Sequence, residues 1–203
     1  MRTRHTRVLG GVLAALTATA LAAGCSTDPS SAPSSSGPSS APAAAPISAE
    51  HTPADIAFAQ AMIPHHRQAV AMSAQAARQA SSPAVKDLAG RIDAEQGPEI
   101  EQMSRMLDTW GAPRPPEGSM SMAMPGMPGM MSDAQMKQPA TQSGPAFDRT
   151  FLQMMIEHHT GAVQMARTEQ ARGSNPQARD LAGSIITAQE REIGEMRALL
   201  AGV

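Results

Sequence analysis

The sequence predicts an all-α protein, an antiparallel four-helix bundle of the ferritin-like kind that is built from a duplicated helical hairpin. The first observation is an internal repeat: residues 55–110 align with residues 148–203 without a gap, and 22 of the 56 pairs are identical. The second is a set of helix start signals, two in the first copy and one in the second. A unit of two helices buries its apolar stripe by packing on its copy, and two packed hairpins form a bundle.

Each expected helix is bounded by residues that favour helix termini. Proline is pre-set for the first helical position, and it follows a capping residue at Pro53, Pro83 and Pro176. Gly111 and Gly173 mark helix ends. Apolar residues between these signals recur with the period of a helix. We expect long helices near residues 53–80, 83–109, 146–172 and 176–201, and a short helix from Ser132 to about Gln138.

Residues 1–24 have the pattern of a bacterial lipoprotein signal peptide. Three arginines precede an apolar run from Val8 to Ala23, which is short for a membrane span of ~20 residues. The run ends at Leu21-Ala22-Ala23-Gly24-Cys25, which resembles a lipobox. Cys25 is the only cysteine, so it forms no disulfide within the chain, and lipidation accounts for it. The alternative is an ordinary signal peptide that is cut nearby and leaves a free thiol.

The expected domain organisation follows from these signals. After the signal peptide, residues 25–50 are the lipidated cysteine and a tether of Ser, Pro and Ala, whose composition buries too little apolar surface to fold. Such a tether holds a domain at the outer face of the cytoplasmic membrane or in the cell envelope. The duplicated domain is residues 51–203: repeat one is 53–110, a methionine-rich connection is 111–144, and repeat two is 145–203.

Composition excludes nucleic acid as a partner. Without the three arginines of the signal, 13 basic residues face 18 acidic ones, a net charge of −5. Such a chain does not attract a phosphate backbone. Aromatic residues make up 2% of the sequence, so platforms for base stacking are absent as well.

The candidate site lies at the middle of the repeat helices. Four of the six histidines form the matching pairs His65-His66 and His158-His159. Counted from the hairpin turn, His65 and Glu99 differ in height by ~1.5 Å, so we expect His65 to face Glu99 and His158 to face Glu192. His66 and His159 are expected to point toward the neighbouring hairpin. The methionines expected within about a turn of this level are Met62 and Met103 in copy one and Met155 and Met196 in copy two.

These residue types favour a transition metal, with copper first and zinc or iron as alternatives. Imidazole binds all three metals, a carboxylate adds a hard donor, and methionine sulfur selects Cu(I). The connection offers a second candidate site with several thioethers at short spacings: Met120, Met122, Met124, Met127, Met130 and Met131. Bland alternatives remain open. The histidines and glutamates could form a structural hydrogen-bond network, the connection could be a biased linker, and Met72, Met106 and Met165 are expected to fill the core.

The stretch from Phe58 through Met62-Ile63-Pro64-His65-His66 to Met72, and its match in copy two through Met165, resembles the bacterial domain-of-unknown-function 305 family. The resemblance covers residues from about 53 to 200. It implies a ferritin-like four-helix bundle, export or lipid anchoring in many members, and copper binding or copper tolerance in some. No family-wide reaction comes with it.

The sequence therefore favours a non-catalytic protein of the cell surface that sequesters copper, confers tolerance or hands the metal over. Protein partners are not identified by the sequence. One alternative is a ferritin-like metal-dependent oxidase, but such enzymes use more carboxylates than Glu99 and Glu192. Another is a metal-free helical interaction or scaffold domain.

Overall fold

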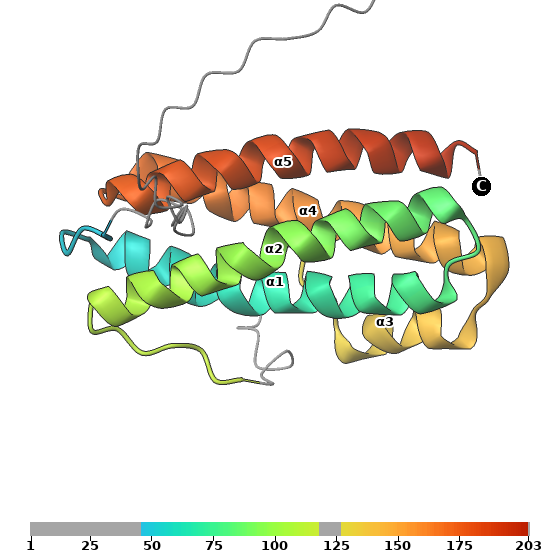
Figure 1. Ribbon diagram of the computed structural model, residues 1–203, viewed down its shortest axis with the longest axis horizontal. Coiled ribbons are helices and arrows are strands. Elements are labelled where there is room, and N and C mark those ends of the chain that lie inside the picture. The colour runs from blue at the N-terminus through green and yellow to red at the C-terminus, as the bar shows by residue number, and fades with distance from the viewer. Residues whose placement is uncertain (1–45, 118–126, 203) are drawn as a thin grey trace, which may run out of the picture. The chain divides into compact units, whose positions relative to one another are not determined.

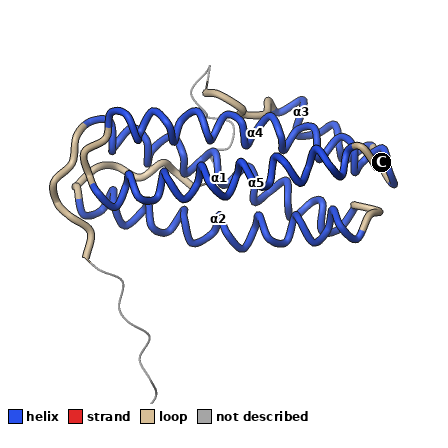
Figure 2. The backbone as a smooth tube through the Cα atoms, turned by 90° about the horizontal axis from the view of Figure 1, so that it is seen from above, coloured by secondary structure: helices blue, strands red, loops and turns tan. Residues whose placement is uncertain are grey.

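The computed structural model describes residues 46–117 and 127–202, and in these residues the fold is all helical, as predicted. Four long helices run along a common axis (Figures 1 and 2). The expected signal peptide, Cys25 and most of the expected tether lie outside the described residues. The elements are α1 (Pro53–Gln79), α2 (Pro83–Thr109), α3 (Asp133–Lys137), the 3-10 helix η1 (Gln138–Thr141), α4 (Gly144–Arg172) and α5 (Pro176–Leu200).

The helix boundaries follow the predicted signals closely. A proline stands in the first turn of each long helix, and Gly173 ends α4. The short predicted helix is present as α3, where the Ser132 hydroxyl accepts a hydrogen bond from the Gln135 backbone N–H. The start of α4 at Gly144 lies two residues before the expected position.

Each repeat forms one hairpin, α1 with α2 and α4 with α5, and α1 and α4 pack on each other in opposite directions (Figure 1). Because α2 ends at the same end of the bundle from which α1 starts, the connection must run the length of the bundle before α4 begins. One long crossover of this kind is the ferritin-like arrangement.

Two buried aspartates at equivalent positions join the hairpins to each other. Asp148, near the start of α4, accepts hydrogen bonds from the backbone N–H groups of Ser81 and Ser82 in the turn between α1 and α2. Asp55, near the start of α1, accepts from the backbone of Ser174 and Asn175 in the other turn. Both aspartates are fully buried or nearly so. Each copy thus satisfies the turn of its partner, which fixes the register of the bundle.

Residues that we expected in the tether belong in part to the bundle. The Ser48 carbonyl accepts hydrogen bonds from the Trp110 indole N–H and from the Asn175 amide, and the Pro46 carbonyl accepts one from Gln177. The ordered domain therefore begins before residue 51. Within the described residues, none of the helices has the length and hydropathy to cross a membrane.

Candidate functional site

A polar layer crosses the middle of the bundle and separates two apolar clusters. One cluster holds Met62 and Met103, and the other holds Met155 and Met196. Between them lie the four paired histidines, none of which is exposed to solvent. Polar side chains at this depth are costly unless they are paired or bind a ligand. The layer is therefore the first candidate for a functional site.

His65 and His158 meet at the centre of this layer. Their ring centroids are 3.7 Å apart with the rings tilted by 38°. Since these residues are equivalent in the two copies, the pseudo-twofold axis of the bundle passes between them. Burial, with a further contribution from the neighbouring histidines, lowers the pKa of His65 to about 3 and holds the pKa of His158 well below its usual value. Both rings are neutral at physiological pH.

The other member of each pair binds the glutamate. His66 Nε2 lies 2.8 Å from Glu99 Oε2, and His159 Nε2 lies 2.7 Å from Glu192 Oε2. Our assignment of His65 and His158 to these glutamates was wrong. Adjacent residues differ by only 1.5 Å in height but by about 100° around the helix, so the height that we counted from the turn does not distinguish them. The direction does: α1 presents His66 to α2 and His65 to α4.

Hydrogen bonding leaves ring nitrogens free at the centre. The Pro128 carbonyl lies 3.1 Å from His65 Nε2, and because a carbonyl only accepts, Nε2–H donates and Nδ1 carries the lone pair. The carboxyl oxygens of Glu99 and Glu192 act as acceptors in the same way, which gives His66 and His159 the same tautomer. The Nδ1 atoms of all four histidines, and also Nε2 of His158, are buried without a hydrogen-bond partner.

This arrangement fits histidines prepared as metal ligands. Ligating histidines commonly donate their second ring N–H to a carboxylate or a backbone carbonyl, which fixes the tautomer and the ring orientation. His65, His66 and His159 all do so here. Glu99 and Glu192 accordingly lie where they orient imidazoles. Among the described residues, no group of three or more His, Cys, Asp or Glu side chains is placed to hold a metal ion, so a ligand set of three here includes methionine sulfur or needs side chains to turn.

The methionines predicted near the site are all buried in the two apolar clusters beside the polar layer. Met62, Met103, Met155 and Met196 are each 0% exposed. Met72 and Met106 are core residues as expected, and Met165 is only half-buried. Met62, Met103, Met155 and Met196 therefore fill space in the core. Their thioethers are also the soft donors nearest in sequence and register to the histidines.

The methionine-rich connection is divided by the structure. Met120, Met122 and Met124 lie outside the described residues. Met127 and Met130 are half-buried, whereas Met131 is 4% exposed and belongs to the core cluster around Met155. Met131 therefore packs in the core, as Met62 and Met155 do.

Residues 127–131 cross the bundle directly over the histidine layer. The Gln68 side chain binds both the backbone N–H and the carbonyl of Met131, at 2.7 and 2.9 Å. Gly161, the equivalent of Gln68 in copy two, is so close to the same segment that an added Cβ would lie 2.1 Å from the Pro128 carbonyl oxygen. Gly129 of the segment has a φ of 74° and packs on the α4 backbone around Gly161. This segment and the Pro128 hydrogen bond cover His65 on one side.

The site residues predicted from the sequence did not include Gln68, Gly161 or a pair of buried amides. Gln96 and Gln189 are 2% and 3% exposed, and both have side-chain atoms without a hydrogen-bond partner. Each lies one turn before the glutamate of its helix, at the edge of the polar layer. The signal that could have found them is their identity in both copies at a position where an apolar residue is expected.

Fold and site together define a class of helical bundle in which two copies of one hairpin enclose a layer of paired histidines. A family model described as "Domain of unknown function (DUF305)" matches residues 55–200. The chain belongs to this family, which confirms the resemblance inferred from its His-His motifs.

Solved structures of relatives show the same fold. A DUF305 protein from Streptomyces coelicolor, described as a candidate secreted protein, is 37% identical with a TM-score of 0.67, covering 73% of this chain and 93% of that chain. A DUF305 fragment from Deinococcus radiodurans is 33% identical with a TM-score of 0.67, covering 75% and 98%. CopM in its Cu(II)-bound form is 33% identical with a TM-score of 0.63, covering 73% and 96%. CopM is also known in Cu(I)-bound and silver-bound forms. No curated protein matches the chain.

Proposed function

We propose that this protein binds copper at the cell surface and sequesters it or passes it on, without turning over a substrate. The observation that carries the proposal is the set of buried ring nitrogens without partners in the histidine layer, where Pro128, Glu99 and Glu192 hold three of the four rings in one tautomer. Similarity to CopM, a protein with Cu(I), Cu(II) and silver forms, supports copper over other metals.

The donor set agrees with a soft metal. Neutral imidazoles and thioethers suit copper, and methionine sulfur binds few harder ions. We assign His65, His66, His158 and His159 as ligands, with Met62, Met103, Met155 and Met196 as the sulfur donors available to them. Glu99 and Glu192 orient His66 and His159. Zinc and iron also bind the nitrogen donors, but thioethers are poor ligands for both metals.

An oxidase of the ferritin-like kind is less well supported. Such enzymes hold their metals with several carboxylates from four helices. Here the two matched carboxylates already accept hydrogen bonds from histidines. Binding without turnover is the simpler chemistry for this site.

Anaerobic Cu(I) titration of the purified domain against a competing chelator tests the proposal. We expect changing the four histidines to alanine to weaken Cu(I) binding at least a hundredfold, because the nitrogen donors are lost. The matched control is His51→Ala, which removes a histidine outside the layer that stacks on Trp110 and should leave the affinity unchanged. Circular dichroism confirms that the variants stay helical. Equal affinity of the quadruple variant and the unaltered protein would refute the site.

The connection is tested separately. Changing Met120, Met122 and Met124 to leucine keeps the apolar volume and removes the thioethers. We expect the number of Cu(I) ions bound per chain to fall while the tightest site remains. An unchanged stoichiometry would show that these methionines do not bind copper.

Export and anchoring complete the proposed function. Residues 1–24 direct export, and a lipid on Cys25 holds the domain at the membrane. In cells, Cys25→Ser is expected to move the protein from the membrane fraction to the medium or the soluble envelope fraction. Retention of the variant in the membrane fraction would rule out lipidation as the anchor.

A further inference from the structure

Two equivalent grooves lie between α1 and α4, one on each side of the pseudo-twofold axis, and the residues that the structure describes fill only one of them. Met136 of α3 and Pro139 of η1 lie in the first groove, and about 10 Å³ of free space remains there. Its walls are Met72 and Gln75 of α1 and residues including Phe151 of α4. The covering segment thus contributes a methionine and a proline side chain.

The second groove is open and holds about 340 Å³. Shifting each wall residue of the filled groove by 93 positions gives a wall residue of the open one: Phe151 corresponds to Phe58, Met72 to Met165 and Gln75 to Thr168. The two grooves are therefore copies of one surface. A volume of this size is typical of a ligand site.

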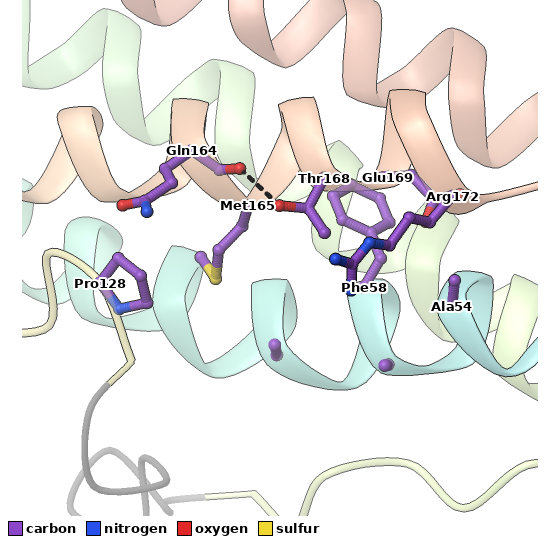
Figure 3. Close-up of a pocket in the computed structure, with 10 residues that line it drawn as sticks. Ala54, Phe58, Pro128, Gln164, Met165, Thr168, Glu169 and Arg172 are labelled. Carbon is purple, nitrogen blue, oxygen red and sulfur yellow. Dashed lines mark hydrogen bonds between the residues drawn. The ribbon is translucent and has the colours of Figure 1, made fainter.

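The open groove differs from its copy in depth and in charge. Ala54 and Ala61 stand where the filled groove has Phe147 and Met154, so its wall on α1 is cut back. Arg172 stands where copy one has Gln79. Figure 3 shows the Arg172 guanidinium near Phe58 at one end of the groove and Pro128 at the other. Arg172 is exposed and makes no ion pair among the described residues.

We propose that the open groove binds a short peptide segment of a partner protein that presents a methionine followed by a proline and ends in a carboxylate. The filled groove supplies the template for the first two groups. In it the chain runs from Met131, which Gln68 holds at mid-helix, toward the start of α4 near the C-terminal end of α1. The pseudo-twofold axis carries that direction onto the open groove, where the end of the occupant reaches Arg172.

Charge complementarity supplies the third group. Arg172 makes no ion pair among the described residues, and Glu169, one turn before it in the wall of the same groove, has a pKa raised by burial to about 8 and so holds a proton at neutral pH. At the end of an apolar groove, the guanidinium therefore favours a carboxylate of the occupant, because its fork of donors matches the two oxygens. Met165 offers an adaptable thioether surface of the kind that accepts methionine side chains. The inference is independent of copper binding, since it uses no residue of the histidine layer.

The probe is a synthetic peptide of residues 132–141 of this chain, acetylated at its N-terminus and with a free C-terminal carboxylate. The filled groove is not available to it, because the tethered segment already there has a far higher effective concentration. Protein labelled with ¹³C at the methionine methyl groups is titrated in the presence of a metal chelator. We expect the Met165 methyl signal to shift saturably, with a Kd of ~0.1–1 mM, and the Met72 signal to stay in place.

Matched variants locate the binding. Ala57→Trp places a large side chain on the exposed wall of the groove and is expected to abolish binding, whereas Ala84→Trp, an exposed position on α2, leaves it unchanged. Arg172→Gln or amidation of the peptide C-terminus weakens binding about fivefold. The Arg172→Gln protein binds the amidated peptide no more weakly than it binds the peptide with a free carboxylate.

Several outcomes overturn the proposal. One is a Met165 signal that does not move at millimolar peptide, and another is a shift at Met72, which would mean that the peptide displaces α3. Equal binding of a peptide with serine in place of methionine excludes the methionine requirement. Tighter binding of a linear fatty acid, or self-association that Ala57→Trp abolishes, assigns the groove to an amphiphile or to a second copy of the chain.

Discussion

The two copies of the hairpin agree at the centre of the bundle and differ around the connection that joins them. At the centre, each copy supplies a His-His pair, a glutamate one helix away and a buried methionine on either helix. Beside the connection, Gln68 of copy one corresponds to Gly161 of copy two. Near the helix ends, Ala76 of copy one corresponds to Glu169, which lies beside Asp55. The comparison shows which features belong to the duplicated site and which arose from a single connection crossing a symmetric bundle.

Gln68 and Gly161 show how one asymmetric segment imposes opposite demands on equivalent positions. The segment passes on one side where a long polar side chain can satisfy its backbone groups, and on the other side where there is no room for a Cβ. Both residues hold the Pro128–Met131 segment against the histidine layer. Separate substitutions at the two positions distinguish the steric requirement at Gly161 from the hydrogen-bonding requirement at Gln68.

The largest expected effect in this comparison is that of Gly161→Ala. Its Cβ would lie 2.1 Å from the backbone oxygen of Pro128, so the segment must move away and lose its packing. We expect the free energy of unfolding to fall by about 3 kcal/mol. Gln68→Ala removes two hydrogen bonds to Met131 and should lower it by about 2 kcal/mol. Urea unfolding monitored by circular dichroism measures both changes.

Gly90→Ala is the control for the glycine substitution. Gly90 lies inside α2, and an added Cβ there meets nothing within 4 Å. It should raise the free energy of unfolding by about 1 kcal/mol, since alanine favours a helix. A Gly161→Ala protein as stable as the unaltered protein would mean that the segment does not pack on α4 as described.

A second difference is expected between the two glutamates of the polar layer. The Glu192 side chain is 3% exposed and that of Glu99 is 18% exposed. Glu192→Ala leaves the His159 N–H buried without an acceptor and should cost about 3 kcal/mol of stability. After Glu99→Ala, water can reach the His66 N–H, and the cost should be about 1 kcal/mol. Thermal unfolding of the metal-free variants compares the two, and equal losses would show that burial does not separate the pairs.

The helices, the repeat and the level of the site could be predicted from the sequence, because these depend on local signals and on spacing along one chain. Proline at helix starts and glycine at helix ends gave boundaries within two residues. The counting of residues from each turn placed the histidines and glutamates in one layer, where the structure has them.

What the sequence could not provide was the direction of side chains around each helix and the course of the connection. The choice between His65 and His66 as partner of Glu99 depends on where α4 lies relative to α1, which no helical wheel contains. The requirement for Gly161 likewise arises from Pro128, which is 33 residues away and in an irregular segment. Tertiary contacts made by an irregular segment leave no periodic pattern in the sequence from which they could be predicted.

The last difference between the copies separates Glu169 from Ala76 and depends on pH. Glu169 is buried beside Asp55, and this burial, together with the hydrogen bond to Asp55, raises the pKa of Glu169 from 4.5 to about 8. The folded chain therefore keeps a proton that the unfolded chain releases near pH 4.5. The resulting stabilisation is complete below pH 4.5 and is lost as the pH rises through 8. Asp55, whose pKa is lowered, acts in the opposite sense but only on the acid side of this window.

We therefore expect the free energy of unfolding to fall by about 2 kcal/mol between pH 5 and pH 8.5. Glu169→Ala, which installs the residue of copy one, should remove most of this dependence, whereas Glu157→Ala at an exposed position of the same helix should keep it. Urea unfolding at both pH values measures the difference. If the Glu169→Ala protein keeps the full slope, the proton is bound elsewhere, and the two copies do not differ electrostatically at this end of the bundle.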